Sequence, residues 1–454
     1  MKQHEAATRL AEFTVKTKLE DLSPQVLVAV KQLALKTFAG MLAGSSMDAG
    51  ARIADFVRQN PDGNDVGVVG KNFKASLWKA TFANAFFAHQ SELEDDRLNT
   101  GTAWDITTIP MLLPLAQMKE MTGADMLLAS VVGLEVMART CQFYPQGHMG
   151  LSIVPSSVGS AALASRAYGL NTGQTVAAFG LAMSGIPLAY TNFGTDAHYF
   201  ETGVQTLHGL MAVQAAQLGL SSNPDLVRYI GGLLGADRVS TQAMVDKLGQ
   251  YYQFTEIWVK KYPCCLYMHR YIDGLLDIIR GHNVGIDDIV KIRLHVAAGA
   301  MEEVCNRPLP QTVGDLQFSF QHALSATVLD KDVNYRHIHI DRVTDPAFVA
   351  ARKKIEVVPR PDWKSRLLVE TPALLEVEFR DGRKATSERQ YPTGTQHEPL
   401  TLDFVKGLFI KFVGDNLPEA DKKYAADAIA EMERLDRKDV LRLLAVMNRV
   451  PHNL

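Results

Sequence analysis

Apolar positions repeat with helical spacing through most of the first 260 residues. In LVAVKQLALKTFAGMLAG (residues 27–44) and LLASVVGLEVMARTC (residues 127–141), apolar residues recur at i, i+3, i+4 and i+7, which is typical of helices with a buried face. Clusters of Gly, Pro and polar residues, such as NPDGND and SSNPD, separate these stretches and indicate breaks between helices. We therefore predict a mainly α protein whose residues 1–265 form the first part of a large all-helical domain.

The pattern changes after YPCCLYMH, which ends at His269. The stretch IVKIRLHV (residues 289–296) alternates like a strand, and LLEVEFRDGRKATSERQ places Asp381-Gly382 between two extended runs, a strong hairpin signal. We predict a smaller α+β domain over residues 266–395. Helical spacing returns in LTLDFVKGLFIKFVGDNL, so residues 396–454 are predicted to rejoin the helical domain and to make the mixed domain an insertion.

Composition limits the possible partners. The chain has 454 residues, of which 47% are hydrophobic, enough for a large core, and its 47 basic and 50 acidic residues give a net charge of −3 without a basic stripe interleaved with aromatics. Nucleic acid is therefore excluded as an expected partner. No uninterrupted apolar run approaches the roughly 20 residues of a membrane span, and MKQHEAATRL lacks a signal-peptide core. We expect a protein without a membrane partner.

The cysteines favour a reducing compartment. Cys141, Cys264, Cys265 and Cys305 include one adjacent pair, a spacing that suits neither a disulfide framework nor the CxxC pairs of zinc sites. We expect a cytoplasmic protein in which adjacent cysteines are packed thiols rather than nucleophiles.

The stretch HQSELEDD, which begins at His89, concentrates acids behind an apolar helix. On a continued helix, His89, Glu92 and Asp96 share a face about 100° wide, whereas Glu94 and Asp95 point away. Two carboxylates on one partly buried face raise at least one pKa, which suits proton exchange near neutral pH. Two plainer explanations stay open, namely a solvated helix end and ion pairs with arginines elsewhere.

Three further clusters carry candidate chemistry. CQFYPQGHMG places Tyr144 and His148 in a Gly/Pro loop, where a surface position is the alternative. NFGTDAHYFETG brings His198 and Glu201 to the start of a helix, where Thr195 or Asp196 could simply be a cap. VKKYPCCLYMHR carries Lys260, Lys261 and His269 at the change of composition, and domain junctions favour ligand clefts.

Together these segments resemble one family. AFFAHQSELEDD, GLEVMAR, HYFETGVQTLHGLMAVQAA, KKYPCCLYMH and DLQFSFQHALSATVL occur in the order and approximate spacing of the MmgE/PrpD family, which contains 2-methylcitrate dehydratase, cis-aconitate decarboxylase and iminodisuccinate epimerase. The resemblance covers nearly the whole chain. It implies a helical domain built from both chain ends, an inserted α+β lid, a homodimer and an active site in the cleft.

The resemblance also implies roles residue by residue. The family pattern His-x-x-(Asp/Glu)-(Leu/Phe)-Asp-Asp-Thr places Glu92 at the active-site acid position and Asp96 at the usual Thr, and the Lys of Lys-x-Tyr-Pro is Lys260. In Lys-x-x-His-x-Gly, His198 replaces Lys and Glu201 replaces His.

Two more positions depart from the family. Ala103-Trp104 stands for a His-Pro, and Tyr144 replaces the His of Phe-His-Pro beside a short insertion that carries His148. Relative to the family pattern, these replacements remove positive charge from the expected site. The substrate is therefore expected to carry fewer carboxylates than citrate.

The main hypothesis is a cofactor-independent lyase, a dehydratase that takes a proton from a carbon next to a carboxylate of a small hydroxy di- or tricarboxylate. The predicted catalytic residues are Glu92, Asp96, His148, His198 and Lys260, and the predicted substrate-binding residues are Tyr144, Glu201 and His269. No metal site and no cofactor motif is predicted. The alternatives are an isomerase or epimerase on the same scaffold, a decarboxylase, and a catalytically silent binding dimer.

Overall fold

The chain divides into two compact units. A computed structural model describes residues 3–97, 102–103, 105–141, 154–185, 192, 194–226, 240–365 and 370–449. The helical unit contains residues 1–192, 196–257 and 401–454, and the mixed unit contains residues 193–195 and 258–400. Helices dominate the described residues, so the prediction of a mainly α protein is confirmed.

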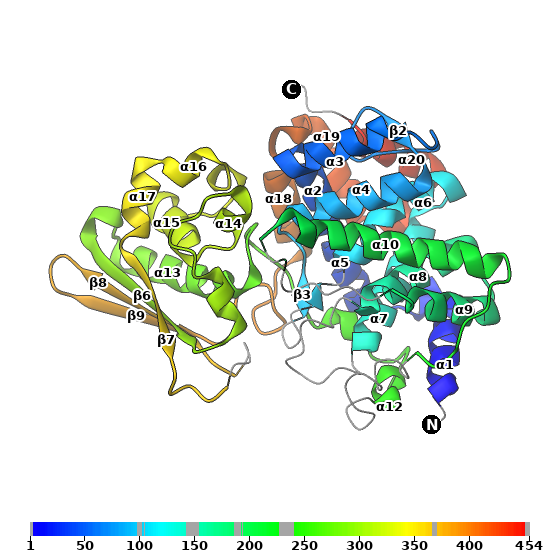
Figure 1. Cartoon of the computed structure of the whole chain (residues 1–454), viewed down its shortest axis with the longest axis horizontal. Helices are drawn as coiled ribbons and strands as arrows, with labels where there is room; N and C mark the ends of the chain where they lie inside the picture. Colours follow the sequence, from blue (N-terminus) through cyan, green and yellow to red (C-terminus); the bar gives the residue numbers. More distant parts are fainter. Residues whose placement is uncertain are drawn as a thin grey trace. The chain divides into compact units, whose positions relative to one another are not determined.

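The helical unit is built from helices of very different lengths (Figure 1). They are α1 (Gln3–Lys16), α2 (Pro24–Ser46), α3 (Asp48–Gln59), α4 (Leu77–Gln90), α5 (Asp105–Thr108), α6 (Leu112–Lys119), α7 (Gly123–Thr140), α8 (Val154–Tyr168), α9 (Thr172–Ala182), α10 (Asp196–Gln217), α12 (Thr241–Val245), α18 (Leu402–Val413), α19 (Glu419–Ala430) and α20 (Arg437–Met447). Short antiparallel pairs join β1 (Val66–Gly67) to β2 (Lys74–Ala75) and β3 (Asp96–Arg97) to β4 (Thr102–Ala103).

Helix α2 forms the centre of this unit. Ser23 caps its first turn by accepting a hydrogen bond from the Val26 N–H, and Pro24 stands at the first helical position, where proline is favoured. Both α4 and the late helix α18 pack against α2, so the C-terminal segment contributes to the core that the N-terminal segment begins.

The length of α2 corrects one expectation. Its 23 residues, with a mean hydropathy of 1.5, are long and apolar enough to cross a membrane, and 89% of that window is buried within the protein. Lys31, Gln32 and Lys36 interrupt its apolar sequence, so a prediction based on uninterrupted apolar runs does not include this helix. The burial is that of a core helix, whose apolar residues pack against neighbouring helices.

Small residues allow the helices that carry the candidate site to approach closely. A Cβ on Gly44 of α2 would lie 1.9 Å from the Phe87 carbonyl oxygen of α4, and a Cβ on Gly209 of α10 would lie 2.5 Å from the Ser157 carbonyl oxygen of α8. Helix α10 packs against both α4 and α8, as Figure 1 shows. These contacts fix the positions of α4 and α10 within one core.

A buried ion pair lies in the GLEVMAR segment. Arg139 and Glu135, one turn apart on α7, are both fully buried, and Arg139 Nε lies 2.5 Å from Glu135 Oε1. The guanidinium also donates to the carbonyl oxygens of Asp246 (2.6 Å) and Tyr251 (2.7 Å), and Glu135 Oε2 accepts from the Phe254 N–H. The pair thus anchors the segment from residue 244 to residue 254 on α7.

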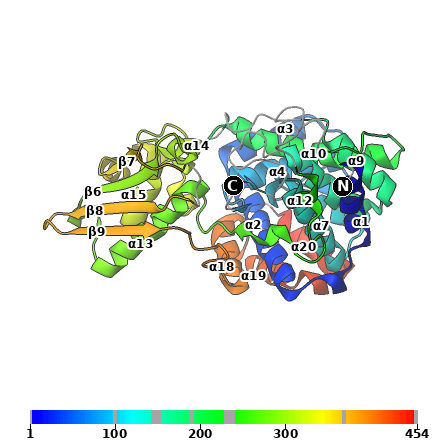
Figure 2. The same cartoon turned by 90° about the horizontal axis from the view of Figure 1, so that it is seen from below.

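The mixed unit contains a four-stranded sheet in the order β7-β6-β8-β9 (Figure 2). Its strands are β6 (Ile289–Ala297), β7 (Ile355–Arg360), β8 (Ala373–Phe379) and β9 (Lys384–Arg389), and its helices are α13 (His269–His282), α14 (Val313–Gln317), α15 (Phe320–Asp330), α16 (Asp341–Thr344) and α17 (Pro346–Arg352). Strands β6 and β7 are parallel, and the other two pairs are antiparallel. The predicted strand at 289–296 and the hairpin around Asp381-Gly382 are confirmed.

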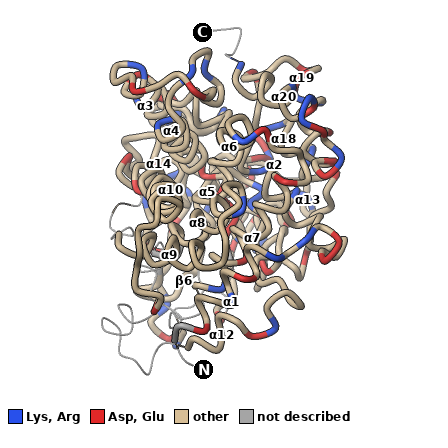
Figure 3. The backbone as a smooth tube through the Cα atoms, turned by 90° about the vertical axis from the view of Figure 1, so that its right-hand side faces the viewer, with Lys and Arg blue, Asp and Glu red and all other residues tan. Residues whose placement is uncertain are grey.

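All four cysteines lie in the described part of the chain and are buried, and none forms a disulfide. Burial raises the pKa of the Cys305 thiol well above its usual range, and its hydrogen bond with Cys265 adds to this. These are packed thiols, as the sequence predicted. A cytoplasmic location stays a prediction. Acidic and basic positions are interspersed in the view of Figure 3.

Candidate active site

The acidic stretch leaves the helix earlier than predicted. Helix α4 ends at Gln90, and Glu92 adopts a left-handed backbone conformation with φ of 53°. The Glu92 N–H closes a tight turn on the His89 carbonyl oxygen (3.0 Å), and the Leu93 N–H bonds to Ser91 Oγ. The helical placement of residues 91–96 was therefore wrong, whereas His89 and Gln90 do lie on the helix. Such a conformation is rare for a residue with a side chain and costs on the order of 1–3 kcal/mol, so the surrounding structure must hold it.

The four acids are buried, which corrects a second expectation. Glu92, Asp95, Asp96 and Glu94 are exposed by only 1%, 0%, 6% and 7%. The explanation of a solvated helix end is therefore wrong. The expectation that Glu94 and Asp95 point away from the buried face is wrong as well. The chain turns inward after Gln90, so side chains that an ideal helix would direct to solvent enter the core.

Asp95, one of these four acids, is held by an ion pair and hydrogen bonds within the core. Asp95 Oδ1 lies 3.2 Å from the fully buried Lys36 Nζ, which also donates to the Leu93 carbonyl oxygen at 2.9 Å. Asp105 Oδ1 accepts from the Asp95 N–H, and its Oδ2 accepts from Thr37. Complete burial raises the pKa of the Asp105 carboxyl well above its usual range, and the charge of Asp95 raises it further. Lys36 and Asp105 together hold the loop that presents Glu92.

Three side chains converge beside this loop. His89 at the end of α4, Glu92 in the following turn and His198 near the start of α10 each offer a ligand atom, and these atoms all lie within 4.8 Å of one another. The three side chains are 4%, 1% and 7% exposed. We name them the His-Glu-His cluster. A carboxylate next to two imidazoles in a buried wall is suited to accepting and returning protons.

Neighbouring groups orient the cluster. His89 Nδ1 lies 2.5 Å from Thr202 Oγ1, one turn beyond His198 on α10. The rings of His89 and His198 have centroids 4.2 Å apart, and Tyr199 packs edge-on against His89 at 5.4 Å. When His89 donates Nδ1–H to Thr202, its lone pair lies on Nε2, which can then accept a proton; when the Thr202 hydroxyl donates to Nδ1, the N–H lies on Nε2 instead.

The other predicted residues of the helical unit lie on the same elements. Asp96 begins β3 and pairs in register with Ala103 of β4. Glu201 lies on α10, three residues after His198, is only partly buried and accepts a hydrogen bond from Asn192 Nδ2. Burial raises the pKa of the Glu201 carboxyl, and the hydrogen bond from Asn192 opposes this rise.

Lys260 and His269 belong to the mixed unit. Both are fully buried. His269 begins α13, its Nε2 lies 3.2 Å from the Cys264 carbonyl oxygen, and its ring packs against Tyr262 at 5.1 Å. Their roles stay predictions. Tyr144, His148 and Trp104 lie outside the described residues.

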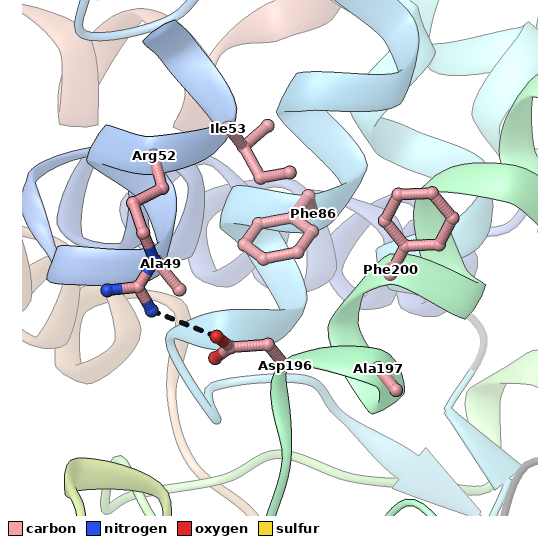
Figure 4. A pocket seen from close by; sticks show the side chains of 7 residues that line it. All are labelled: Ala49, Arg52, Ile53, Phe86, Asp196, Ala197 and Phe200. Carbon is pink, nitrogen blue, oxygen red and sulfur yellow. Dashed lines mark hydrogen bonds and ion pairs between the residues drawn. The ribbon is translucent and has the colours of Figure 1, made fainter. Parts of the chain in front are cut away.

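A shallow apolar pocket of about 210 Å³ lies between α3, α4 and α10. Figure 4 shows Phe86 and Phe200 facing this space, with the ion pair between Arg52 and Asp196 at one side. The pocket contains none of the predicted site residues. Its few polar groups make it a poor site for a carboxylate substrate.

Sequence reasoning did not assign several residues of the site. His89 was recognised on the acidic face but was given no role, and Lys36, Asp105 and Thr202 were not considered. The only available signal for Lys36 was a charged residue inside a strongly apolar helix. Such a residue is normally paired, but its partner, 59 residues away, cannot be read from spacing.

The comparisons with known proteins agree with this architecture. The MmgE/PrpD N-terminal domain matches residues 8–237, and the MmgE/PrpD C-terminal domain matches residues 262–434. The chain is 24% identical to cis-aconitate decarboxylase from Mus musculus over 423 residues, covering 86% of this chain and 83% of the relative. It is also 24% identical to cis-aconitate decarboxylase from Homo sapiens over 422 residues, covering 86% and 84%. The two family domains together match most of the chain, which therefore belongs to the MmgE/PrpD family.

Proposed function

We propose that this protein is a lyase that acts on a small carboxylate, and that its reaction begins with proton abstraction next to a carboxylate group. The observation that carries the proposal is the convergence of Glu92, His89 and His198 in the buried interior of the helical unit. Membership of the MmgE/PrpD family and the likeness to two decarboxylases support the reaction class.

The cluster has the parts that proton transfer needs. The Glu92 carboxylate is the base that takes the proton from carbon. The imidazole of His198, which lies beside Glu92, exchanges that proton with the carboxylate and returns a proton to the product. The contact between Thr202 Oγ1 and His89 Nδ1 orients the imidazole ring of His89. Positioned general acids and bases each contribute about 10²–10⁴ in rate.

Dehydration is the reaction that we propose first. Glu92 takes the proton, the electrons of the C–H bond form a carbon–carbon double bond, and the hydroxyl group on the neighbouring carbon leaves with a proton as water. A carboxylate next to the reacting carbon stabilises the negative charge that develops there. The chain's own residues supply the acid and the base of this reaction.

Decarboxylation of an unsaturated tricarboxylate is the second candidate, because both relatives are cis-aconitate decarboxylases. In that reaction a carbon–carbon bond breaks, carbon dioxide leaves and a proton is delivered to carbon. The same cluster would deliver that proton.

A single assay separates these reactions. Hydroxy and unsaturated di- and tricarboxylates are incubated with the protein in deuterated water and followed by proton NMR. A new vinyl proton signal from a hydroxy acid indicates dehydration, and loss of a carboxylate with deuterium delivered to carbon indicates decarboxylation. Deuterium at the α-carbon without elimination would favour the isomerase or epimerase and would contradict the lyase. A protein that changes none of these compounds would favour the catalytically silent binding dimer.

We also propose a homodimer. Helix α10 buries one face, yet Phe200, Val204 and Met211 on its other face are 46%, 40% and 41% exposed. Trp78 of α4 is 42% exposed, and its Nε1–H donates a hydrogen bond to Gln214, which lies near the C-terminal end of α10. Several exposed large apolar residues on one helix are typical of an interface, and a second copy is the partner that the family resemblance implies.

The homodimer is tested by the mass of the protein in solution. Val204→Asp with Met211→Asp is expected to convert a dimer into a monomer in multi-angle light scattering, because two charges would be buried unpaired. Leu441→Asp is the matched control, since Leu441 on α20 is 57% exposed outside this surface. A wild-type monomer at micromolar concentration would contradict the proposal.

A further inference from the structure

We propose that His89, Glu92 and His198 form a binding site for one divalent transition-metal ion of the zinc class, and that the ion competes with proton transfer for the same atoms. The sequence predicted no metal site, because the three residues do not follow a familiar metal-binding spacing. The described structure nevertheless brings one ligand atom from each within 4.8 Å of the others.

The ligand types suit such an ion. Two imidazoles and one carboxylate hold zinc in many enzymes, and a similar set holds other divalent transition metals. Calcium and magnesium instead prefer sites made of oxygen atoms. The combination of two nitrogens and one carboxylate oxygen therefore favours Zn²⁺, Co²⁺ and related ions.

The geometry requires only small movements. Three atoms that are at most 4.8 Å apart all lie within about 2.8 Å of one common point, whereas zinc bonds to nitrogen and oxygen at about 2.0–2.2 Å. Each ligand atom would therefore move toward an ion at that point by at most about 0.7 Å. Rotation of the side chains achieves this without moving α4 or α10.

The surroundings support metal binding in two ways. When His89 binds the ion through Nε2, its bond from Nδ1 to Thr202 Oγ1 orients the ring, as a bond to the second ring nitrogen does for a histidine ligand. Glu92 is held in a left-handed conformation, and that turn places its carboxylate beside both rings. A site with three protein ligands keeps a further position open for water or a substrate carboxylate.

Competition follows from the sharing of lone pairs. A bound ion occupies the carboxylate of Glu92 and one nitrogen of each histidine, the same atoms that the proposed function uses for protons. The inference does not depend on that function, because metal binding is measured without substrate.

The experiment titrates the full-length, chelator-treated protein with Co²⁺ and follows visible absorption, with Zn²⁺ as the competing ion. Wild type is expected to bind one Co²⁺ per chain, and Zn²⁺ is expected to displace it. His198→Lys keeps a cation but removes a ligand, and is expected to weaken binding by more than about a hundredfold, beyond the 10–100-fold cost of losing an outer-shell partner. His208→Ala removes a histidine from α10 outside the cluster and should bind as wild type does.

Three results would overturn the proposal. These are no cobalt spectrum in the wild type, equal affinity in wild type and His198→Lys, and strong near-ultraviolet absorption from thiolate ligands, which would assign the ion to Cys264, Cys265 or Cys305. Unfolding midpoints of all variants separate lost binding from lost structure. If substrate turnover is found, Zn²⁺ must inhibit it in wild type, and a chelator must restore it.

Discussion

Two buried clusters in the helical unit contain similar side chains and differ in what they do. In one, Glu135 and Arg139 lie four residues apart on α7, and the guanidinium bonds to the acid and to carbonyl oxygens of the segment 244–254. In the other, His89 and Glu92 lie three residues apart at the end of α4 and meet His198 from α10. Both clusters are almost completely buried.

The difference lies in how the hydrogen-bonding groups are used. Arg139 directs its donors at backbone oxygens, so the first cluster fixes one segment of chain to α7. The His-Glu-His cluster directs groups that accept protons at one another, and one of its members, Glu92, has an unfavourable backbone conformation. Burial and helical spacing alone therefore do not separate a structural pair from the proposed reactive cluster, and the convergence of proton-accepting atoms is the observation on which that proposal rests.

The largest expected effect concerns the reactive cluster. His198→Ala should lower turnover by about 10²–10⁴, because one positioned acid–base group is lost, while the unfolding midpoint stays within a few degrees of wild type. His208→Ala on the same helix is the matched control. Steady-state kinetics with the substrate found by NMR measure the effect, and equal turnover in the two variants would remove His198 from the reaction.

The structural cluster should respond through stability. Arg139→Met leaves Glu135 buried without its partner, and is expected to lower the free energy of unfolding by about 3–5 kcal/mol. The double variant with Glu135→Gln should lose less than the sum of the two single variants, because neither charge then remains buried. Urea unfolding followed by circular dichroism measures both. Loss of turnover per folded molecule without loss of stability would reverse the roles of the clusters.

A larger residue at Gly44 of α2 is expected to push α4, the helix that carries His89, out of position. Gly44→Ala places a methyl group 1.9 Å from the Phe87 carbonyl oxygen, and such overpacking costs about 1–3 kcal/mol. Because Phe87 precedes His89 on α4, turnover should also fall. Gly407→Ala in α18 meets no atom within 4 Å and should stabilise the protein by up to about 1 kcal/mol. Equal midpoints in the two variants would contradict the close contact.

A pH dependence is expected at the base of the Glu92 loop. Burial raises the pKa of Asp105 in the folded chain, whereas the unfolded chain has its ordinary value of about 3.9. The folded state therefore keeps a proton that the unfolded state releases. This contribution to stability is complete below about pH 4 and is lost as the pH rises toward the folded pKa.

Asp105→Asn removes that titration. The free energy of unfolding of wild type, relative to the variant, should fall by about 1.4 kcal/mol per pH unit within this window. Urea unfolding of both proteins at a series of pH values measures it. Parallel curves would show that Asp105 titrates normally.

The long helices and the hairpin could be predicted because their signals are local. Residues 27–44 and 127–141 repeat with helical spacing, and Asp381-Gly382 marks a turn by itself. The break after Gln90 could not be predicted, because distant groups stabilise it. Lys36 bonds to the Leu93 carbonyl oxygen, and Asp105 accepts from the Asp95 N–H.

The site was predictable in part for the same reason. Glu92 and His198 are residue types that suit acid–base chemistry, and family patterns mark both positions. Their meeting depends on the packing of α10 against α4, which no spacing in the sequence encodes. Thr202 resembles any other helical threonine until it is found beside His89.

The central claim is that Glu92 takes a proton from carbon, and solvent exchange tests it most directly. Wild type, Glu92→Gln and the matched variant Glu94→Gln are incubated with substrate in deuterated water, and deuterium at the carbon next to the carboxylate is followed by proton NMR. The account predicts exchange in wild type and Glu94→Gln, and exchange at least about a hundredfold slower in Glu92→Gln with an unchanged unfolding midpoint. Equal exchange rates in wild type and Glu92→Gln would contradict it.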